Sequence, residues 1–203
     1  TYPGLEVAGT IVATGEAISE YKIGDRVCAL LAGGGYAEYC VVDAGQVLPI
    51  PGALSMIEAA ALPEAYFTAY SNLYEFGRLK RGESLLVHGG SSGVGVAAIQ
   101  LASSLGSTVF ATAGSEEKGR LCESLGASRA IDYKQADFVT EIQSLTQNRG
   151  VDVVLDMVGG AYLARNVQVL TTEGRLVCIA TQSGPKGELD ILRVMQRRLS
   201  ITG

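Results

Sequence analysis

Apolar residues change their spacing along the chain near residue 54. Before that point they form short runs separated by glycine-rich turns, which is typical of β-strands. We expect strands within residues 6–15, 25–31 and 36–51. After it, apolar runs alternate with amphipathic stretches, which predicts strands alternating with helices.

The stretch after residue 54 carries the signals of a helix start and a helix end. Ser55 followed by Glu58 fits a capping box, and MIEAAAL begins a helix. Pro63 interrupts or restarts this helix, EAYFTAYSNLYEF continues it, and Gly77 is placed to end it. We expect it to join the two parts of the chain.

Apolar strand candidates then recur with helical stretches between them. Strands separated by helices of this length predict a parallel sheet that is covered on both faces. The predicted fold class is therefore α/β, with a doubly wound parallel Rossmann sheet. The six strand candidates are residues 84–90, 107–114, 127–134, 151–159, 174–181 and 199–203.

The first of these strands leads into a glycine-rich turn, in the sequence SLLVHGGSSGVG. The spacing Gly90-x-x-Gly93-x-Gly95 departs from G-x-G-x-x-G, so by itself it also fits a plain strand-to-helix turn. Its place after the first strand favours a dinucleotide site, because a pyrophosphate binds there at a helix N-terminus.

The end of the second strand indicates which nicotinamide cofactor would bind. Residues 113–115 read Ala-Gly-Ser, where a site for NADH usually has an acidic residue. The two glutamates that follow are explained by the start of a helix. Lys118 can reach a phosphate, and Tyr133 and Lys134 end the third strand, although a solvated surface charge explains each lysine equally well. The pattern favours NADPH.

Composition narrows the classes of partner and location. A net charge of −5 gives no general attraction to nucleic acid or to an anionic membrane, so we expect neither partner. No apolar run approaches the roughly 20 residues of a spanning helix, and no secretory signal opens the chain, so we expect a cytoplasmic protein. The four cysteines show no C-x-x-C spacing and are expected to be free thiols.

Several long stretches resemble the medium-chain dehydrogenase/reductase superfamily, and within it the zinc-free quinone oxidoreductases related to zeta-crystallin and the p53-inducible type. They are PGLEVAGTIVATGEAI, YKIGDRVCALLAGGGYAEY, ALPEAYFTAYSNL, VHGGSSGVGVAAIQLA, FATAGSEEK and DVVLDMVGG. The resemblance implies part of a GroES-like β-rich catalytic domain in residues 1–60 and a Rossmann domain, with the joining helix, in residues 61–203. Both ends of the chain look cut, so we expect residues 1–60 to be poorly ordered or completed by another chain if the polypeptide is only 203 residues long.

The resemblance also implies where the cofactor binds. The glycine turn would contact the pyrophosphate, a second group would surround the phosphorylated ribose, and a third would approach the nicotinamide. The expected cofactor-binding residues are Thr68, Gly89, Gly90, Ser91, Ser92, Gly93, Val94, Gly95, Gly114, Ser115, Lys118, Tyr133, Gly159, Ala180 and Thr181.

The sequence lacks the residues of a zinc site at two positions. Zinc-dependent relatives have a G-H-E motif where this chain has Gly4-Leu5-Glu6, and a cysteine where it has Glu64, so we expect no metal. The only histidine, His88, is interpreted as a core polar group with its hydrogen bonds satisfied. No catalytic residue is assigned.

The resemblance implies an NADPH-dependent oxidoreductase that passes hydride to a quinone or an α,β-unsaturated carbonyl, without zinc. An enoyl-thioester reductase of the same superfamily is an alternative, and so is a non-catalytic NADPH-binding module. Relatives commonly pair through the edge of the Rossmann sheet, so we expect a homodimer formed through the final strand, LSITG.

Overall fold

The computed structural model describes residues 2–203 and divides the chain into two units, Thr1–Thr68 and Ala69–Gly203. Helix α2 (Pro63–Tyr70) runs across the boundary between the units. The domain division predicted at residues 1–60 and 61–203 stays a prediction.

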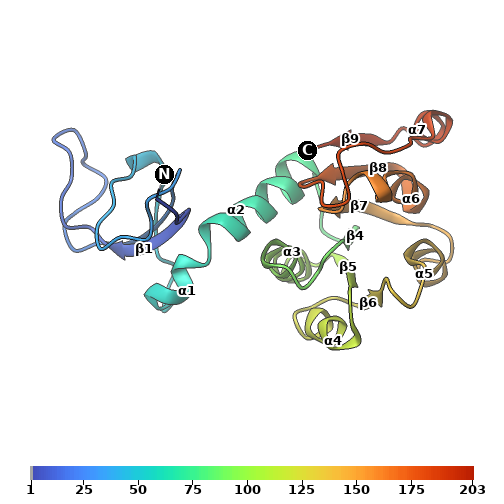
Figure 1. Cartoon of the computed structure of the whole chain (residues 1–203), viewed down its shortest axis with the longest axis horizontal. Helices are drawn as coiled ribbons and strands as arrows, with labels where there is room; N and C mark the ends of the chain where they lie inside the picture. The colour runs from blue at the N-terminus through green and yellow to red at the C-terminus, as the bar shows by residue number, and fades with distance from the viewer. Residues whose placement is uncertain (1) are drawn as a thin grey trace. The chain divides into compact units, whose positions relative to one another are not determined.

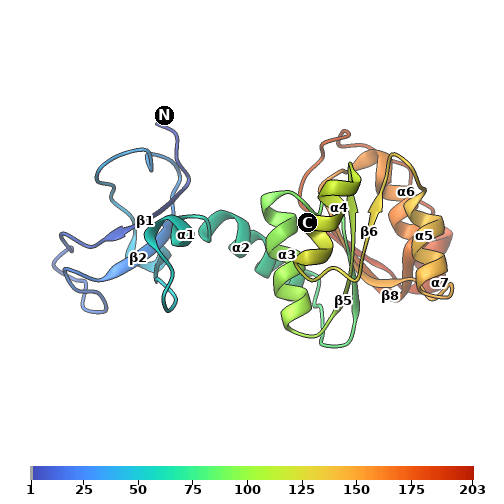
Figure 2. The same ribbon diagram turned by 90° about the horizontal axis from the view of Figure 1, so that it is seen from below.

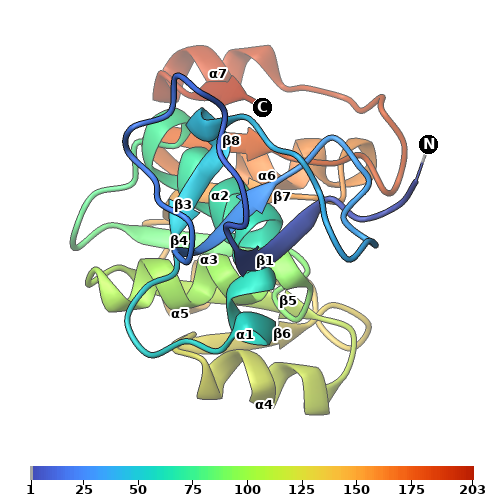
Figure 3. The same ribbon diagram turned by 90° about the vertical axis from the view of Figure 1, so that its left-hand side faces the viewer.

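The first unit contains a three-stranded antiparallel sheet in the order β1-β2-β3, of which β1 and β3 can be followed in Figure 3. Strand β1 (Glu6–Thr10) pairs along its whole length with β2 (Arg26–Leu30), and β2 also pairs with β3 (Val47–Pro49). These strands confirm the β-rich character predicted for this part of the chain.

The predicted strands of the first unit were too long. Residues 36–43 form no strand, although they are rich in tyrosine and valine. Tyr36, Tyr39 and Val41 are instead largely exposed. A strand needs a neighbouring edge to pair with, and β-propensity without that partner does not fix an extended ladder.

The helix signals after residue 54 are confirmed. Ser55 caps α1 (Met56–Ala60) in a capping box with Glu58, and Pro63 restarts the chain as α2. Residues Ser71–Phe76 continue from α2 as a π-helix that ends at Gly77. The π-helix packs against the large sheet of the second unit.

The second unit is a six-stranded parallel sheet in the order β6-β5-β4-β7-β8-β9. Helices α3 and α4 cover one face, and α5, α6 and α7 cover the other (Figures 1 and 2). The strand order reverses between β4 and β7, which confirms the predicted doubly wound fold.

Each predicted strand of this sheet is present, with shifted ends. The strands are β4 (Ser84–Val87), β5 (Thr108–Ala113), β6 (Arg129–Asp132), β7 (Val151–Asp156), β8 (Leu170–Cys178) and β9 (Ser200–Thr202). The helices are α3 (Gly93–Ser104), α4 (Glu116–Ser124), α5 (Phe138–Leu145), α6 (Leu163–Val169) and α7 (Ile191–Arg197).

One hydrophobic cluster of this unit lies between the sheet and helices α5 and α6. Strands β4 and β7 are buried along their entire length, as expected for a parallel sheet covered on both sides. Phe138 of α5 and Val167 of α6 are fully buried in a cluster that includes Leu86 and Val154 of those two strands.

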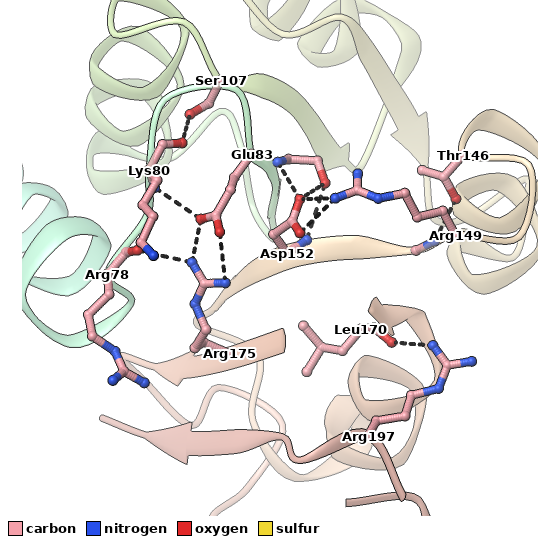
Figure 4. Close-up of polar contacts among 12 residues, drawn as sticks. Arg78, Lys80, Glu83, Ser107, Thr146, Arg149, Asp152, Leu170, Arg175 and Arg197 are labelled. Carbon is pink, nitrogen blue, oxygen red and sulfur yellow. Dashed lines mark hydrogen bonds and ion pairs between the residues drawn. The ribbon is translucent and has the colours of Figure 1, made fainter. Parts of the chain in front are cut away.

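Buried polar contacts fasten the amino-terminal edge of the sheet (Figure 4). The Asp152 carboxylate accepts hydrogen bonds from the Ser84 amide at 2.8 Å and from its hydroxyl at 2.7 Å, and it pairs with Arg149 at 2.8 Å. These contacts join β4 to β7 at the end opposite to the glycine turn.

Candidate functional site

The glycine turn, residues 88–95, follows β4 and leads into α3. Its glycines are needed where backbones approach closely. A Cβ at Gly95 would lie 2.4 Å from the Gly89 carbonyl oxygen, and one at Gly90 would lie 2.8 Å from the Ala111 Cβ. Gly89 has a φ of +64°, which favours glycine. A Cβ at Gly93, by contrast, would meet nothing within 4 Å.

Ser92 begins helix α3. Its hydroxyl oxygen accepts the Gly95 N–H at 3.1 Å, and the hydroxyl donates to the Met157 sulfur at 3.4 Å. The remaining N–H groups of the first turn lack carbonyl partners within the helix and carry its positive dipole end. Since Met157 directly follows β7, the turn sits beside the switch point of the sheet. This geometry suits a pyrophosphate.

A second group of predicted residues lies after β5 and β6. Ser115 caps α4 and accepts the Lys118 N–H at 3.3 Å. A Cβ at Gly114 would lie 2.9 Å from the Tyr133 hydroxyl oxygen, so the structure brings these two residues together. The Lys118 and Tyr133 side chains are exposed and available to a ligand.

A third group lies after β7 and β8. The turn at residues 157–160, which we call the Gly159 turn, has Gly159 at a φ of +87°. A Cβ there would lie 2.8 Å from the Thr181 Cα. Ala180 and Thr181 lie two and three residues after the end of β8, so the two predicted segments are neighbours.

The second unit therefore places fourteen of the predicted residues after the carboxyl ends of its parallel strands, at one edge of the sheet. Ligands of open α/β sheets bind at this edge. The remaining predicted residue, Thr68, lies in α2 in the first unit. The roles assigned to all of them stay predictions.

His88 is fully buried at the end of β4. Its Nδ1 lies 3.1 Å from the Thr112 hydroxyl and its Nε2 lies 2.7 Å from the Asn166 amide oxygen. Both ring nitrogens thus have partners, as the sequence predicted. Burial lowers the pKa of His88 to about 4, and the nearby Arg165 charge acts in the same direction, against the hydrogen bond to Asn166.

This burial predicts a pH-dependent stability. Because the pKa of His88 falls from 6.5 to about 4 on folding, the unfolded chain binds the proton more tightly. The contribution of neutral His88 to the free energy of unfolding is therefore at its full value above pH 6.5. The free energy of unfolding falls by about 3 kcal/mol as the pH falls toward 4. We expect urea unfolding to show a steeper loss for the wild type than for His88→Gln over this range. Parallel curves for the two proteins would contradict the assignment.

Sequence reasoning missed three residues of the site. Thr112 and Asn166 are the partners of His88, and Asp156 ends β7 with its carboxylate buried. Burial raises the pKa of Asp156, although the hydrogen bonds that its carboxylate accepts from N–H groups act to lower it. The signal that could have found Asp156 is an acidic residue that ends the apolar strand VDVVLD.

Comparison with known proteins identifies the fold. Residues 93–203 match the family described as zinc-binding dehydrogenase, and residues 1–52 match the alcohol dehydrogenase GroES-like domain. The chain belongs to the medium-chain dehydrogenase/reductase superfamily. The predicted fold class, α/β with a Rossmann sheet and part of a GroES-like domain, is confirmed.

Individual relatives of this superfamily are similar over nearly the whole chain. Quinone oxidoreductase of Rattus norvegicus is 37% identical over 99% of this chain and 61% of its own length. A synaptic vesicle membrane protein VAT-1 homolog of Homo sapiens is 40% identical over 98% of this chain and 52% of its own length. The chain thus spans little more than half the length of these relatives.

Solved structures give the same result. Escherichia coli quinone oxidoreductase complexed with NADPH has a TM-score of 0.87 at 30% identity, over 98% of this chain and 62% of that one. The CurK enoyl reductase has a TM-score of 0.84 at 35% identity, over 98% of this chain and 59% of that one.

The zinc of the family description does not fit the donors present. The first unit has a groove of about 510 Å³. The acidic side chains that line it are Glu6 and Glu64, and the apolar Leu5 lines it as well. Glu6 already accepts the Glu64 N–H at 2.9 Å. Two carboxylates do not make the histidine and cysteine set that zinc prefers. Within residues 2–203, no three histidine, cysteine or acidic side chains cluster to hold a metal ion.

The cysteines are free, and burial raises the pKa of Cys28, Cys122 and Cys178, which disfavours the reactive thiolate. Cys40 is exposed. Across the described part of the chain, no helix has both the length and the apolar character needed to cross a bilayer.

Proposed function

We propose that this chain is the cofactor-binding part of a zinc-independent oxidoreductase that takes NADPH and reduces a quinone or an α,β-unsaturated carbonyl. The observation that carries the proposal is the Ser92-capped helix α3, which starts beside the switch point of the sheet. The quinone oxidoreductases among its relatives, one of them complexed with NADPH, support the same activity.

The glycine turn would hold the pyrophosphate. Gly93 leaves an open approach to the start of α3, and Gly95 lets the helix come within contact of the turn. Ser91, Ser92 and Val94 would supply the remaining contacts. Lys118 would pair with the ribose phosphate, and Gly114 would leave room for it beside Tyr133.

When bound, the reduced nicotinamide supplies a hydride to an electron-poor carbon of the substrate. A quinone or enone already has a low-lying acceptor orbital. Its reduction therefore needs less help from a Lewis acid than the reaction of an alcohol dehydrogenase does. Gly159 and the segment of Ala180 and Thr181 would lie at the nicotinamide end. These residues would orient the ring and exclude water.

Cofactor binding tests the proposal directly. We expect the 203-residue chain to bind NADPH at least about tenfold more tightly than NADH, since a phosphate paired with lysine contributes a charge-assisted hydrogen bond. Cofactor fluorescence measures both affinities, because the chain has no tryptophan. The Lys118→Ala variant should lose this preference without losing NADH. Equal affinities in the wild type would contradict the phosphate site.

An enoyl-thioester reductase is the second candidate, which the likeness to the CurK enoyl reductase favours. NADPH oxidation with a panel of quinones and a panel of enoyl thioesters separates the two activities. If the complete protein binds NADPH but turns over neither panel, the hypothesis that remains is a non-catalytic NADPH-binding module.

We also propose that the protein forms a homodimer through β9, the edge strand of the large sheet. Ile201 of this strand is partly exposed. Helix α7, which precedes β9 in the sequence, also exposes apolar side chains, namely Ile191, Leu192 and Met195. An unpaired edge with apolar neighbours favours pairing with a second copy. Sedimentation velocity tests this proposal, and a monomer at micromolar concentration would contradict it.

A further inference from the structure

Four buried polar side chains from four elements of the second unit form one hydrogen-bonded chain. Thr112 lies in β5, His88 follows β4, Asn166 lies in α6 and Asp156 ends β7. Each of them is at most 1% exposed. A fully satisfied network at this depth fixes its members in one arrangement, because each lost partner would leave a buried polar group unpaired.

The direction of the hydrogen bonds follows from the carboxylate end. Both Asp156 oxygens accept N–H groups, and Asn166 Nδ2 donates to one of them at 3.0 Å. The Asn166 oxygen therefore faces His88 Nε2, which must carry the ring proton. His88 Nδ1 is then the acceptor for the Thr112 hydroxyl.

This hydrogen-bonded network ends on both sides at backbone amides of turns that are predicted to bind the cofactor. At one end, Thr112 Oγ1 accepts the Gly89 N–H at 3.2 Å, in the glycine turn. At the other end, Asp156 accepts the Val158 N–H at 2.7 Å and the Gly159 N–H at 3.2 Å, in the Gly159 turn. The hydrogen bonds run in one direction from the Gly89 amide to Asp156, whose carboxylate also accepts the amides of the second turn.

Aromatic packing holds the imidazole in place. The rings of Phe138 and Tyr162 meet His88 edge-on, with centroids 4.7 and 4.8 Å away. The Arg165 guanidinium lies over the Phe138 ring at 4.1 Å. The His88 ring is therefore packed against aromatic rings as well as hydrogen-bonded, which favours one orientation of the ring.

We propose that Thr112, His88 and Asn166 are positioning residues that fix the glycine turn and the Gly159 turn relative to each other, so that one NADPH molecule meets both. This inference rests on the proposed function for the identity of the ligand. None of the three side chains needs to touch the cofactor, since each acts through the backbone of a turn.

The first test reads the tautomer without any ligand. His88 is the only histidine, so a nitrogen-15 spectrum of the imidazole in the 203-residue chain contains the signals of one ring. We expect a proton on Nε2 and a lone pair on Nδ1. A proton on Nδ1 alone would reverse the chain of hydrogen bonds and overturn the inference.

The second test measures NADPH affinity in matched variants. Thr112→Val keeps the shape but removes the hydroxyl, and we expect it to weaken NADPH binding about tenfold. Thr112→Ser keeps the hydroxyl and should bind within about twofold of the wild type. Asn166→Ala, at the other end of the network, should weaken binding to a similar degree.

Ser84→Ala is the control for a purely structural effect. Ser84 is also buried and hydrogen-bonded, but to Asp152 at the opposite edge of the sheet. We expect this variant to melt at a lower temperature and to bind NADPH like the wild type. Circular dichroism establishes that each variant is folded before its affinity is compared, and Asn166→Ala carries the test if Thr112→Val does not fold.

The outcomes separate the two proposals. If the wild type binds NADPH and neither Thr112→Val nor Asn166→Ala weakens binding, the positioning role is wrong while the proposed function stands. The same holds if Ser84→Ala weakens NADPH binding as much as they do. If the folded wild type binds no NADPH, the proposed function fails and takes the cofactor role of the network with it. The imidazole spectrum still decides the direction of the hydrogen bonds.

Discussion

Gly95→Ala is expected to weaken NADPH binding at least about 100-fold and to destabilise the chain by roughly 3 kcal/mol. The new Cβ would lie 2.4 Å from the Gly89 carbonyl oxygen and 2.8 Å from the Gly90 Cα. These are backbone atoms that no side-chain rotation can move away, so α3 must shift from the turn that it follows. Fluorescence titration with NADPH and a thermal melt by circular dichroism measure the two effects.

Gly93→Ala is the matched control in the same helix. Its Cβ would meet nothing within 4 Å, so we expect the free energy of unfolding to stay unchanged or to rise by up to about 1 kcal/mol. The melting temperature should stay unchanged or rise accordingly. NADPH binding should still weaken, by about tenfold, because the new methyl group occupies the open side where the pyrophosphate is expected. A Gly95→Ala variant that melts and binds like the wild type would show that the close contact is unnecessary.

Arg175→Met is expected to destabilise the chain by about 3–5 kcal/mol, a fall of roughly 10 °C in melting temperature. The Arg175 guanidinium is almost fully buried and pairs with Glu83 (Figure 4). It also donates to the Gly77 carbonyl at 2.8 Å and to the Arg78 carbonyl at 3.0 Å. Methionine would leave the carboxylate and both carbonyls without these donors at the point where the π-helix ends.

Arg120→Met is the control for removing an arginine from an ion pair. Arg120 pairs with Glu116 one helical turn away, and both side chains are more than 60% exposed. Such pairs contribute little, so we expect a change below about 0.5 kcal/mol. Urea unfolding of both variants gives the comparison. A loss below about 1 kcal/mol for Arg175→Met would contradict the role assigned to the buried pair.

Much of the architecture could be predicted because its signals are local. Apolar runs at β4 and β7 indicate strands buried on both faces of the sheet in the second unit. Ser55 in the first unit and Gly77 in the second mark helix ends by their own local chemistry. The prediction was wrong for residues 36–43, where tyrosine and valine suggest a strand. Strand formation there depends on a pairing partner, which a local pattern does not contain.

The candidate site divides in the same way. The glycine turn and the missing acidic residue after β5 are visible in the sequence, since both depend on the residue types at a few adjacent positions. The network was not visible, because His88 and Asn166 are 78 residues apart and meet only when α6 packs on the sheet. His88 could be predicted to have partners, but their identities could not.

The sequence by itself determined the order of strands and helices along the chain, the glycine turn and the residue types on which the NADPH prediction rests, because each follows from short-range periodicity, turn chemistry or charge. Only the tertiary structure decided which polar groups meet inside the second unit. It placed Arg175 against Gly77 and linked Gly89 to Gly159 through Thr112, His88, Asn166 and Asp156. The physical reason is that burial makes every unpaired polar group costly, so the partners are selected by the packing of distant segments.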